Sequence, residues 1–145
     1  MDKAWAVLIM GVVGGLVALQ APINAGLGKA TGGVGAAVLN FTIGGILLVA
    51  ILVLSGKAGG VTNVGEVRWY YLLGGLFGAA YVFSALMLVD QIGAGGIAAA
   101  TITGQLTLSV IIDRLGILGL EEVPITPDRV VGVVLLLAGT FLIVR

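Results

Sequence analysis

Residues 34–54 read VGAAVLNFTIGGILLVAILVL and contain no charged side chain. A helix needs about 20 mostly apolar residues to cross a hydrocarbon layer about 30 Å thick, because each residue adds about 1.5 Å of length. This stretch is therefore expected to be a membrane helix. The same test is met by four further segments, at residues 4–24, 68–89, 93–112 and 127–144. The sequence predicts an all-α polytopic membrane bundle of five transmembrane helices, forming a single transmembrane domain over residues 1–145.

The composition argues against most soluble functions. Of the 145 residues, 59% are hydrophobic and only 10% are charged, which is too apolar for an ordinary soluble domain. The net charge of zero provides no basic surface, so no nucleic-acid partner is expected. The chain has no cysteine and no histidine, the residues on which most thiol and zinc chemistry depends. We expect no enzyme activity, no catalytic residue, no metal site and no cofactor.

The first predicted helix is interrupted by the sequence QAPIN at residues 20–24. Pro22 has no backbone N–H, so a helix that continues through it leaves the carbonyl oxygen of Ala18 without its usual partner. Two interpretations remain open: the helix continues with a kink near Ala18, or it ends near Pro22 at the membrane surface. The second is favoured by residues 25–33, whose composition is that of a loop.

The positive charges are divided unequally between the two sides of the membrane that five spans define. Five lie on the side of the N-terminus and two on the opposite side: Lys3, Lys57, Arg68, Arg114 and Arg129 against Lys29 and Arg145. By the positive-inside rule, this bias favours a cytoplasmic N-terminus.

An odd number of spans places the two termini on opposite sides, so a second, directly fused copy would enter the membrane inverted. Many transporters hold their substrate near the midplane between two inverted repeats. Three arrangements follow for the present chain. Two copies pair antiparallel with dual topology, or the chain pairs with a homologue of opposite charge bias, or it is not a transporter.

A polar stripe runs along the fourth predicted helix. Thr101, Gln105, Ser109 and Asp113 recur every fourth residue, which places them on one helix face, and Thr103 and Thr107 lie beside them. Such groups either join helices by hydrogen bonds of about 1 kcal/mol each or line a substrate pathway. For the stripe as a whole, the pathway is the favoured interpretation.

Other polar residues extend the candidate site. Gln20, Asn24 and Asn40 lie toward the side of Lys29 and form a candidate polar mouth, although Asn40 is equally suited to the headgroup region. Tyr81, in the third predicted helix, needs a partner for its hydroxyl group.

No Asp or Glu falls clearly in the middle of a span, where a proton-coupled exporter of cations normally has one. Asp90 lies in the tight connection before Gly93, and Asp113 ends the fourth helix beside Arg114. Both are better suited to an interfacial cap or ion pair than to carrying a proton. Either is also a candidate for gating or coupling.

Several of these residues form a recognisable pattern. It comprises Gln20, Pro22, Asn24, Ala25 and Leu27, then Asn40 and Phe41, then Gly104, Gln105, Leu106, Ser109, Asp113 and Gly116, and finally Arg129, Gly132 and Gly139. The chain resembles the short, five-span YdcZ family, an EamA-like branch of the drug/metabolite transporter superfamily. Where that family often has a histidine after the aspartate, this sequence has Arg114.

The resemblance implies half of a ten-helix inverted-repeat transporter, used as an antiparallel homodimer or as one member of a paired set in a prokaryotic plasma membrane. Small multidrug resistance proteins of the same superfamily depend on a glutamate in their first helix, and residues 8–19 contain none. We therefore expect a dimeric transporter of an unidentified small molecule, with its site between the copies. The alternative is a nontransporting membrane scaffold or an accessory subunit of a hetero-oligomer.

Overall fold

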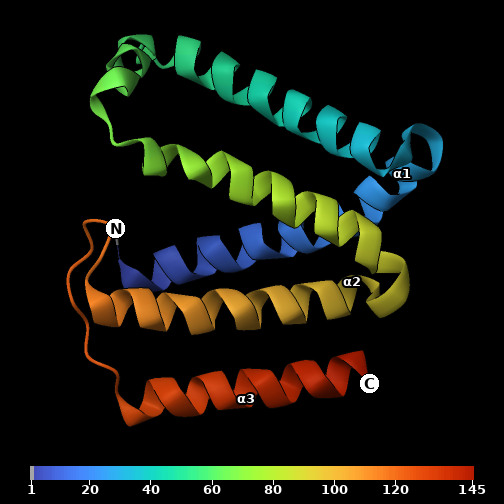
Figure 1. Ribbon diagram of the computed structural model, residues 1–145, viewed down its shortest axis with the longest axis vertical. Helices are drawn as coiled ribbons and strands as arrows, with labels where there is room; N and C mark the ends of the chain where they lie inside the picture. Colours follow the sequence, from blue (N-terminus) through green and yellow to red (C-terminus); the bar gives the residue numbers. More distant parts are fainter. Residues whose placement is uncertain (1) are drawn as a thin grey trace. The chain divides into compact units, whose positions relative to one another are not determined.

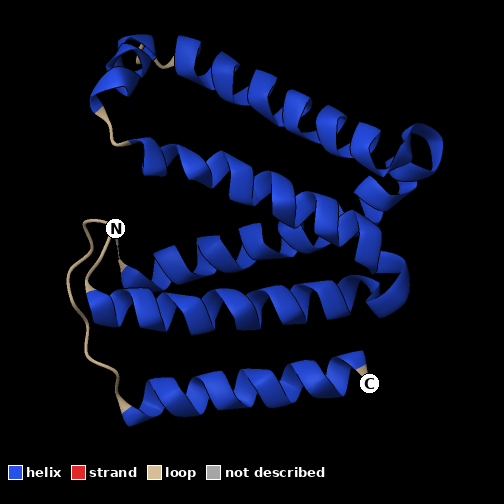
Figure 2. Ribbon diagram, in the orientation of Figure 1, coloured by secondary structure: helices blue, strands red, loops and turns tan. Residues whose placement is uncertain are grey.

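The computed structural model describes residues 2–145, which form helices joined by loops and contain no strand (Figure 2). The long helices are α1 (Lys3–Leu54), α2 (Leu73–Leu115) and α3 (Pro127–Val144) (Figure 1). Two short 3₁₀ helices, η1 (Ala58–Glu66) and η2 (Trp69–Leu72), connect α1 to α2, and residues 116–126 connect α2 to α3. The all-α class predicted from the sequence is confirmed for the described residues.

Each of the two longest helices is divided by one glycine. Gly32 in α1 has φ 74° and ψ 157°, and Gly93 in α2 has φ 71° and ψ 167°. Only glycine adopts this backbone region without steric conflict between its Cβ and the main chain. The helical parts of α1 are thus residues 3–31 and 33–54, and those of α2 are residues 73–92 and 94–115. Together with α3 these are five helical segments, and their passage through a membrane stays a prediction.

The first segment is longer than expected, because it passes through Pro22 and remains helical to residue 31. The helix does not end near Pro22, and residues 25–31 are not a loop. Proline removes a single hydrogen bond from a helix, whereas Gly32 leaves the helical region altogether. The reversal of the chain is therefore confined to one residue and follows Pro22 by nearly three turns.

The third segment begins later than residue 68. Trp69–Leu72 form η2, and the regular helix starts at Leu73. The guanidinium of Arg68 donates a hydrogen bond of 3.0 Å to the hydroxyl of Tyr70, whose ring lies against Tyr71 with 4.7 Å between the ring centres. These bulky side chains are accommodated in a tight first turn. The fourth helical segment covers residues 94–115 where residues 93–112 were expected, and α3 covers Pro127–Val144.

The surface of these helices is apolar. Large hydrophobic side chains are exposed on α1, α2 and α3, and the buried hydrophobic residues are few and mostly small: Ala21, Ala36, Val82, Ala85, Val89 and Ile97. All three helices are long and apolar enough to cross a membrane. In water such a surface would cause aggregation, whereas in lipid it is favourable, because the helices satisfy their own backbone hydrogen bonds.

The chain divides into two compact units. One consists of the chain up to Leu19 together with Leu88–Arg145, and the other of Gln20–Met87. In the second unit, Phe41 packs on the backbone at Gly78, since a Cβ on that glycine would lie 3.6 Å from the Phe41 ring. In the first, α3 packs along residues 94–115 through contacts described below (Figure 1).

Candidate functional site

The polar residues of segment 94–115 lie on two distinct faces of the helix. On one face, Thr103 is only 6% exposed, and its Oγ1 lies 2.6 Å from Oγ1 of Thr140 in α3. The Thr103 hydroxyl is also 3.3 Å from the carbonyl oxygen of Leu136, and the Thr140 hydroxyl is 3.1 Å from that of Ala99. This face is therefore a hydrogen-bonded helix–helix contact.

Two more hydroxyl groups are satisfied within their own helix. Thr107 Oγ1 donates to the carbonyl oxygen of Thr103 at 2.7 Å, and Ser109 Oγ donates to that of Gln105 at 2.7 Å. Because the Ser109 hydroxyl donates its single proton in this bond, its oxygen can still accept a hydrogen bond from another group. Ser109 is exposed and therefore presents a hydrogen-bond acceptor on the surface of the unit.

The other face of segment 94–115 carries Thr101, Gln105 and Ser109. Gln105 is exposed, Thr101 is half-buried, and neither side chain hydrogen-bonds to another residue within 2–145. An amide left unpaired in hydrocarbon costs several kcal/mol. This outer polar face, which we define as Thr101, Gln105 and Ser109, must therefore meet water, another protein or a solute.

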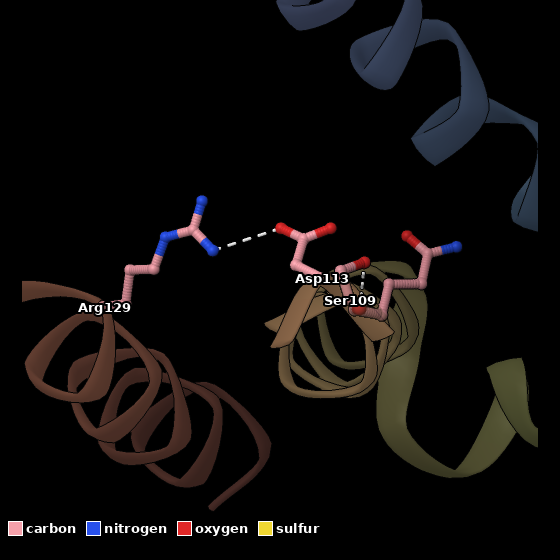
Figure 3. A network of polar contacts seen from close by, with 4 residues as sticks. Ser109, Asp113 and Arg129 are labelled. Atoms are coloured by element: carbon pink, nitrogen blue, oxygen red, sulfur yellow. Dashed lines mark hydrogen bonds and ion pairs between the residues drawn. The ribbon is translucent and has the colours of Figure 1, made fainter. Parts of the chain in front are cut away.

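An ion pair lies one turn beyond Ser109. The guanidinium Nη1 of Arg129 lies 3.1 Å from Oδ2 of Asp113, and both side chains are about a third exposed (Figure 3). The pair joins the end of α2 to the first turn of α3. The sequence predicts an interfacial cap or ion pair for Asp113 without naming its partner, and the neighbouring Arg114 pairs with Glu122.

The loop between α2 and α3 accounts for these two ion pairs. Gly116 has φ 57°, which ends α2 in the left-handed region, and the backbone N–H of Val123 donates to the carbonyl oxygen of Asp113 at 2.8 Å. The loop thus folds back over the end of the helix. It places Glu122 beside Arg114, and Asp113 pairs with Arg129.

The remaining predicted residues fall in the other unit, except for Asp90. Asn24 is buried at 5% exposure, and Gln20, Asn40 and Tyr81 are half-buried. None of the four side chains has a hydrogen-bond partner among the described residues, yet none contains a completely buried unpaired polar atom. Their polar groups therefore keep some access to the surface.

Asp90 is exposed in the first unit and belongs to the helix rather than to a connecting loop, because the connection is reduced to Gly93. No ion pair of Asp90 is found within residues 2–145. The structure thus brings together Asp113 and Arg129, groups Thr101, Gln105 and Ser109 on one face, and leaves Asp90 apart from both.

Thr140 was missed by the sequence analysis, although a signal was present. It is the one hydroxyl residue in the otherwise apolar stretch VVGVVLLLAGTFLIV of residues 130–144. A lone hydroxyl in a membrane helix needs a partner, and this requirement could have identified it as a contact residue.

The chemistry offered by these groups is hydrogen bonding and charge pairing. Within residues 2–145, no cluster of three or more Asp, Glu, His or Cys side chains could hold a metal ion. An amide, hydroxyl groups and one carboxylate–guanidinium pair are suited to recognising a polar solute at the surface of a helix.

Comparison with known proteins identifies the family. The family model described as "Putative inner membrane exporter, YdcZ" matches residues 5–142. A relative from Escherichia coli (strain K12), "Inner membrane protein YdcZ", is 32% identical over 113 residues, which cover 76% of this chain and 74% of the relative. No solved structure matches the chain. With its long apolar helices, the chain is a multi-pass cell-membrane protein, and it belongs to the YdcZ family, whose description is "Putative inner membrane exporter".

Proposed function

We propose that the chain is a small-molecule transporter that crosses the membrane five times and works as an antiparallel pair. The substrate site lies between the two copies and is lined by the outer polar face, Thr101, Gln105 and Ser109. Gln20, Asn24, Asn40 and Tyr81 contribute further polar groups to the pathway.

The observation that supports this proposal most directly is that segment 94–115 has one polar face bonded to α3 and another that is exposed. Thr103 is buried and bonded to Thr140, so the contact with α3 is already made without the outer face. Gln105 stays exposed, and its side-chain amide has no hydrogen-bond partner among the described residues. Since no hydrogen bond to another described residue accounts for the Gln105 side chain, it is available to a solute, to water in a pathway or to another protein, and a pathway between two copies supplies all three.

Antiparallel pairing is supported by the number of helical segments. Five segments give a subunit whose ends lie on opposite sides of the membrane, and only an inverted partner completes an inverted repeat. The five-to-two charge bias also suits a paired homologue of opposite bias, and the site would have the same lining from this chain in either case.

The Asp113–Arg129 pair is suited to controlling access to this pathway. It is only partly buried and makes a single bond between the two groups, so water or a charged solute can compete with it. Asp90, exposed and unpaired among the described residues, is the second candidate for gating.

The exposed amide of Gln105 also fits a nontransporting scaffold, in which a partner helix would cover it. The two functions differ in their response to Gln105→Leu. In a transporter the change removes flux and leaves a folded assembly, whereas in a scaffold it changes assembly or stability and no solute is moved.

The test is uptake by proteoliposomes from a mixture of metabolites, with the lumen analysed by mass spectrometry against empty liposomes. Gln105→Leu should abolish the uptake of whichever solute the unaltered protein accumulates. Gln91→Leu makes the same chemical change at an exposed residue just before the Gly93 turn and should transport normally. Flux that survives Gln105→Leu would show that the proposed lining is wrong.

A further inference from the structure

The two dividing glycines are equivalent in conformation and evenly placed. Gly93 follows Gly32 by 61 residues, and their φ angles differ by 3° and their ψ angles by 10°. Each lies between two helical segments with no other residue outside the helical region. The same local element, helix–glycine–helix, therefore occurs twice in succession.

The buried positions of α1 recur in α2 with the same spacing, although α2 has further buried residues, Val89, Gly96 and Thr103, whose counterparts in α1 are not buried. The buried residues of α1 are Ala21, Asn24 and Ala36. A shift of 61 residues takes them to Val82, Ala85 and Ile97, and all three of these are buried in α2. The correspondence concerns burial rather than residue type, because an asparagine and an alanine occupy the same place.

Four of the polar residues discussed above also fall into two equivalent pairs. Gln20 corresponds to Tyr81, and Asn40 corresponds to Thr101, and all four side chains are half-buried. Gln20 and Asn40 lie on either side of Gly32, as Tyr81 and Thr101 lie on either side of Gly93. Half-buried polar side chains thus recur at equivalent positions before and after the dividing glycine of α1 and of α2.

The segment after each glycine packs against the next helix along the chain. A Cβ on Gly33 would lie 3.8 Å from the sulfur of Met87, near the end of the first part of α2. A Cβ on Gly96 would lie 3.4 Å from Cγ2 of Val144, at the end of α3. Both elements therefore have a fixed support on one side of the glycine.

The glycines themselves are not held by packing. A Cβ added to Gly32 or Gly93 would meet nothing within 4 Å. The carbonyl oxygen of Gly32 accepts a hydrogen bond of 3.4 Å from Oγ1 of Thr31, but no side chain occupies the space beside the Cα of either glycine. The direction of the chain thus changes at a single residue, a location suited to absorbing a change in the angle between helices.

We propose that α1 and α2 are two copies of one helix–glycine–helix element in tandem, and that Gly32 and Gly93 are its equivalent hinges, about which the two arms of each element change their angle. This goes beyond the proposed transport, since it concerns the motion of the chain and requires no solute.

Spin labels at equivalent, exposed positions test the repeat and the hinges together. The chain has no cysteine, so cysteine pairs can be introduced at Leu16 and Leu47 across the first hinge and at Phe77 and Leu108 across the second. Distances are measured by double electron–electron resonance in liposomes, with each labelled protein diluted in excess unlabelled protein to remove distances between copies. The two pairs should give overlapping distance distributions, each broad or with two components. A single narrow distribution, or mean distances that differ widely between the pairs, would overturn the proposal.

Substitution of the glycines provides the second measurement. Gly32→Ala should shift the distribution of the Leu16–Leu47 pair only, and Gly93→Ala that of the Phe77–Leu108 pair only, because alanine does not adopt the hinge conformation. Gly26→Ala and Gly104→Ala are matched controls, since neither glycine has positive φ and a Cβ on either meets nothing within 4 Å. They should leave both distributions unchanged. If a hinge variant fails to fold, the comparison of the two label pairs in the chain with its native glycines still tests the proposal. Unchanged distance distributions in both folded hinge variants would contradict the hinges.

Discussion

The hydroxyl oxygen of Thr103 lies 2.6 Å from that of Thr140, which joins segment 94–115 to α3 by a direct side-chain hydrogen bond. Two residues from Thr103 in either direction, Thr101 and Gln105 lie on another face, and their side chains hydrogen-bond to no described residue. Contact within the subunit therefore uses one face of this helix, and the proposed contact with a partner or solute uses the other. The predictions below separate these two roles.

Removing either hydroxyl of the threonine pair should destabilise the subunit without stopping transport. Thr103→Val and Thr140→Val should each cost about 1 kcal/mol, because hydrogen bonds between membrane helices contribute about that much. The double variant should cost less than the sum, since the first change already breaks the shared bond. The measurement is unfolding by SDS in mixed micelles. Thr42→Val, at an exposed threonine, is the control, and an equal loss there would contradict the role of the pair.

Breaking the Asp113–Arg129 pair should have a small effect on stability. The two side chains are about a third exposed, so solvent screens them and the cost of Arg129→Gln should stay near or below about 1 kcal/mol. The charge-reversed double variant Asp113→Arg with Arg129→Asp should recover most of the loss. The same unfolding assay applies. The Asp113–Arg129 pair would be contradicted if the charge-reversed double variant did not recover stability and Arg114→Gln lost more stability than Arg129→Gln. That result would identify Arg114 as the partner of Asp113.

Glycine substitutions should distinguish a required backbone conformation from simple helix packing. Gly116 has φ 57°, and a Cβ there would lie 3.3 Å from Cβ of Glu122, so Gly116→Ala should cost about 1–2 kcal/mol. Gly132→Ala should be neutral or stabilising by up to about 1 kcal/mol, because that glycine is helical and a Cβ would meet nothing within 4 Å. Thermal unfolding in detergent compares the two. A Gly116→Ala protein as stable as the Gly132→Ala protein would contradict the described turn.

The apolar helices could be predicted from the sequence, but the exact turn at Gly32 could not. The length and apolarity of a segment are local properties, and they identify Pro127–Val144 directly. The stretch of residues 26–35 contains several glycines, and sequence alone does not say which one leaves the helix. The reversal follows from packing, since Gly28 and Gly33 lie against Leu86 and Met87, residues far away in the sequence.

The arrangement of the polar side chains on segment 94–115 could be predicted only in part, because it also depends on packing between helices. The four-residue period gathers Thr101, Gln105 and Ser109 on one face, but it gives no sign of which neighbouring face α3 covers. The sequence predicts an interfacial cap or ion pair for Asp113 beside Arg114, but it does not identify Arg129 as the partner, which lies beyond the loop that folds back on α2. Both outcomes depend on contacts between distant segments, which periodicity does not contain.

Inverted pairing is the central claim, and the sidedness of the two termini tests it most directly. Because the chain has no native cysteine, a single cysteine at Lys3 or at Arg145 can be labelled with a membrane-impermeant maleimide from each side, in intact cells and in inverted vesicles. An antiparallel homodimer predicts that each cysteine is labelled from both sides, in similar proportions. Labelling of Lys3→Cys from the cytoplasmic side alone and of Arg145→Cys from the opposite side alone would contradict the homodimer.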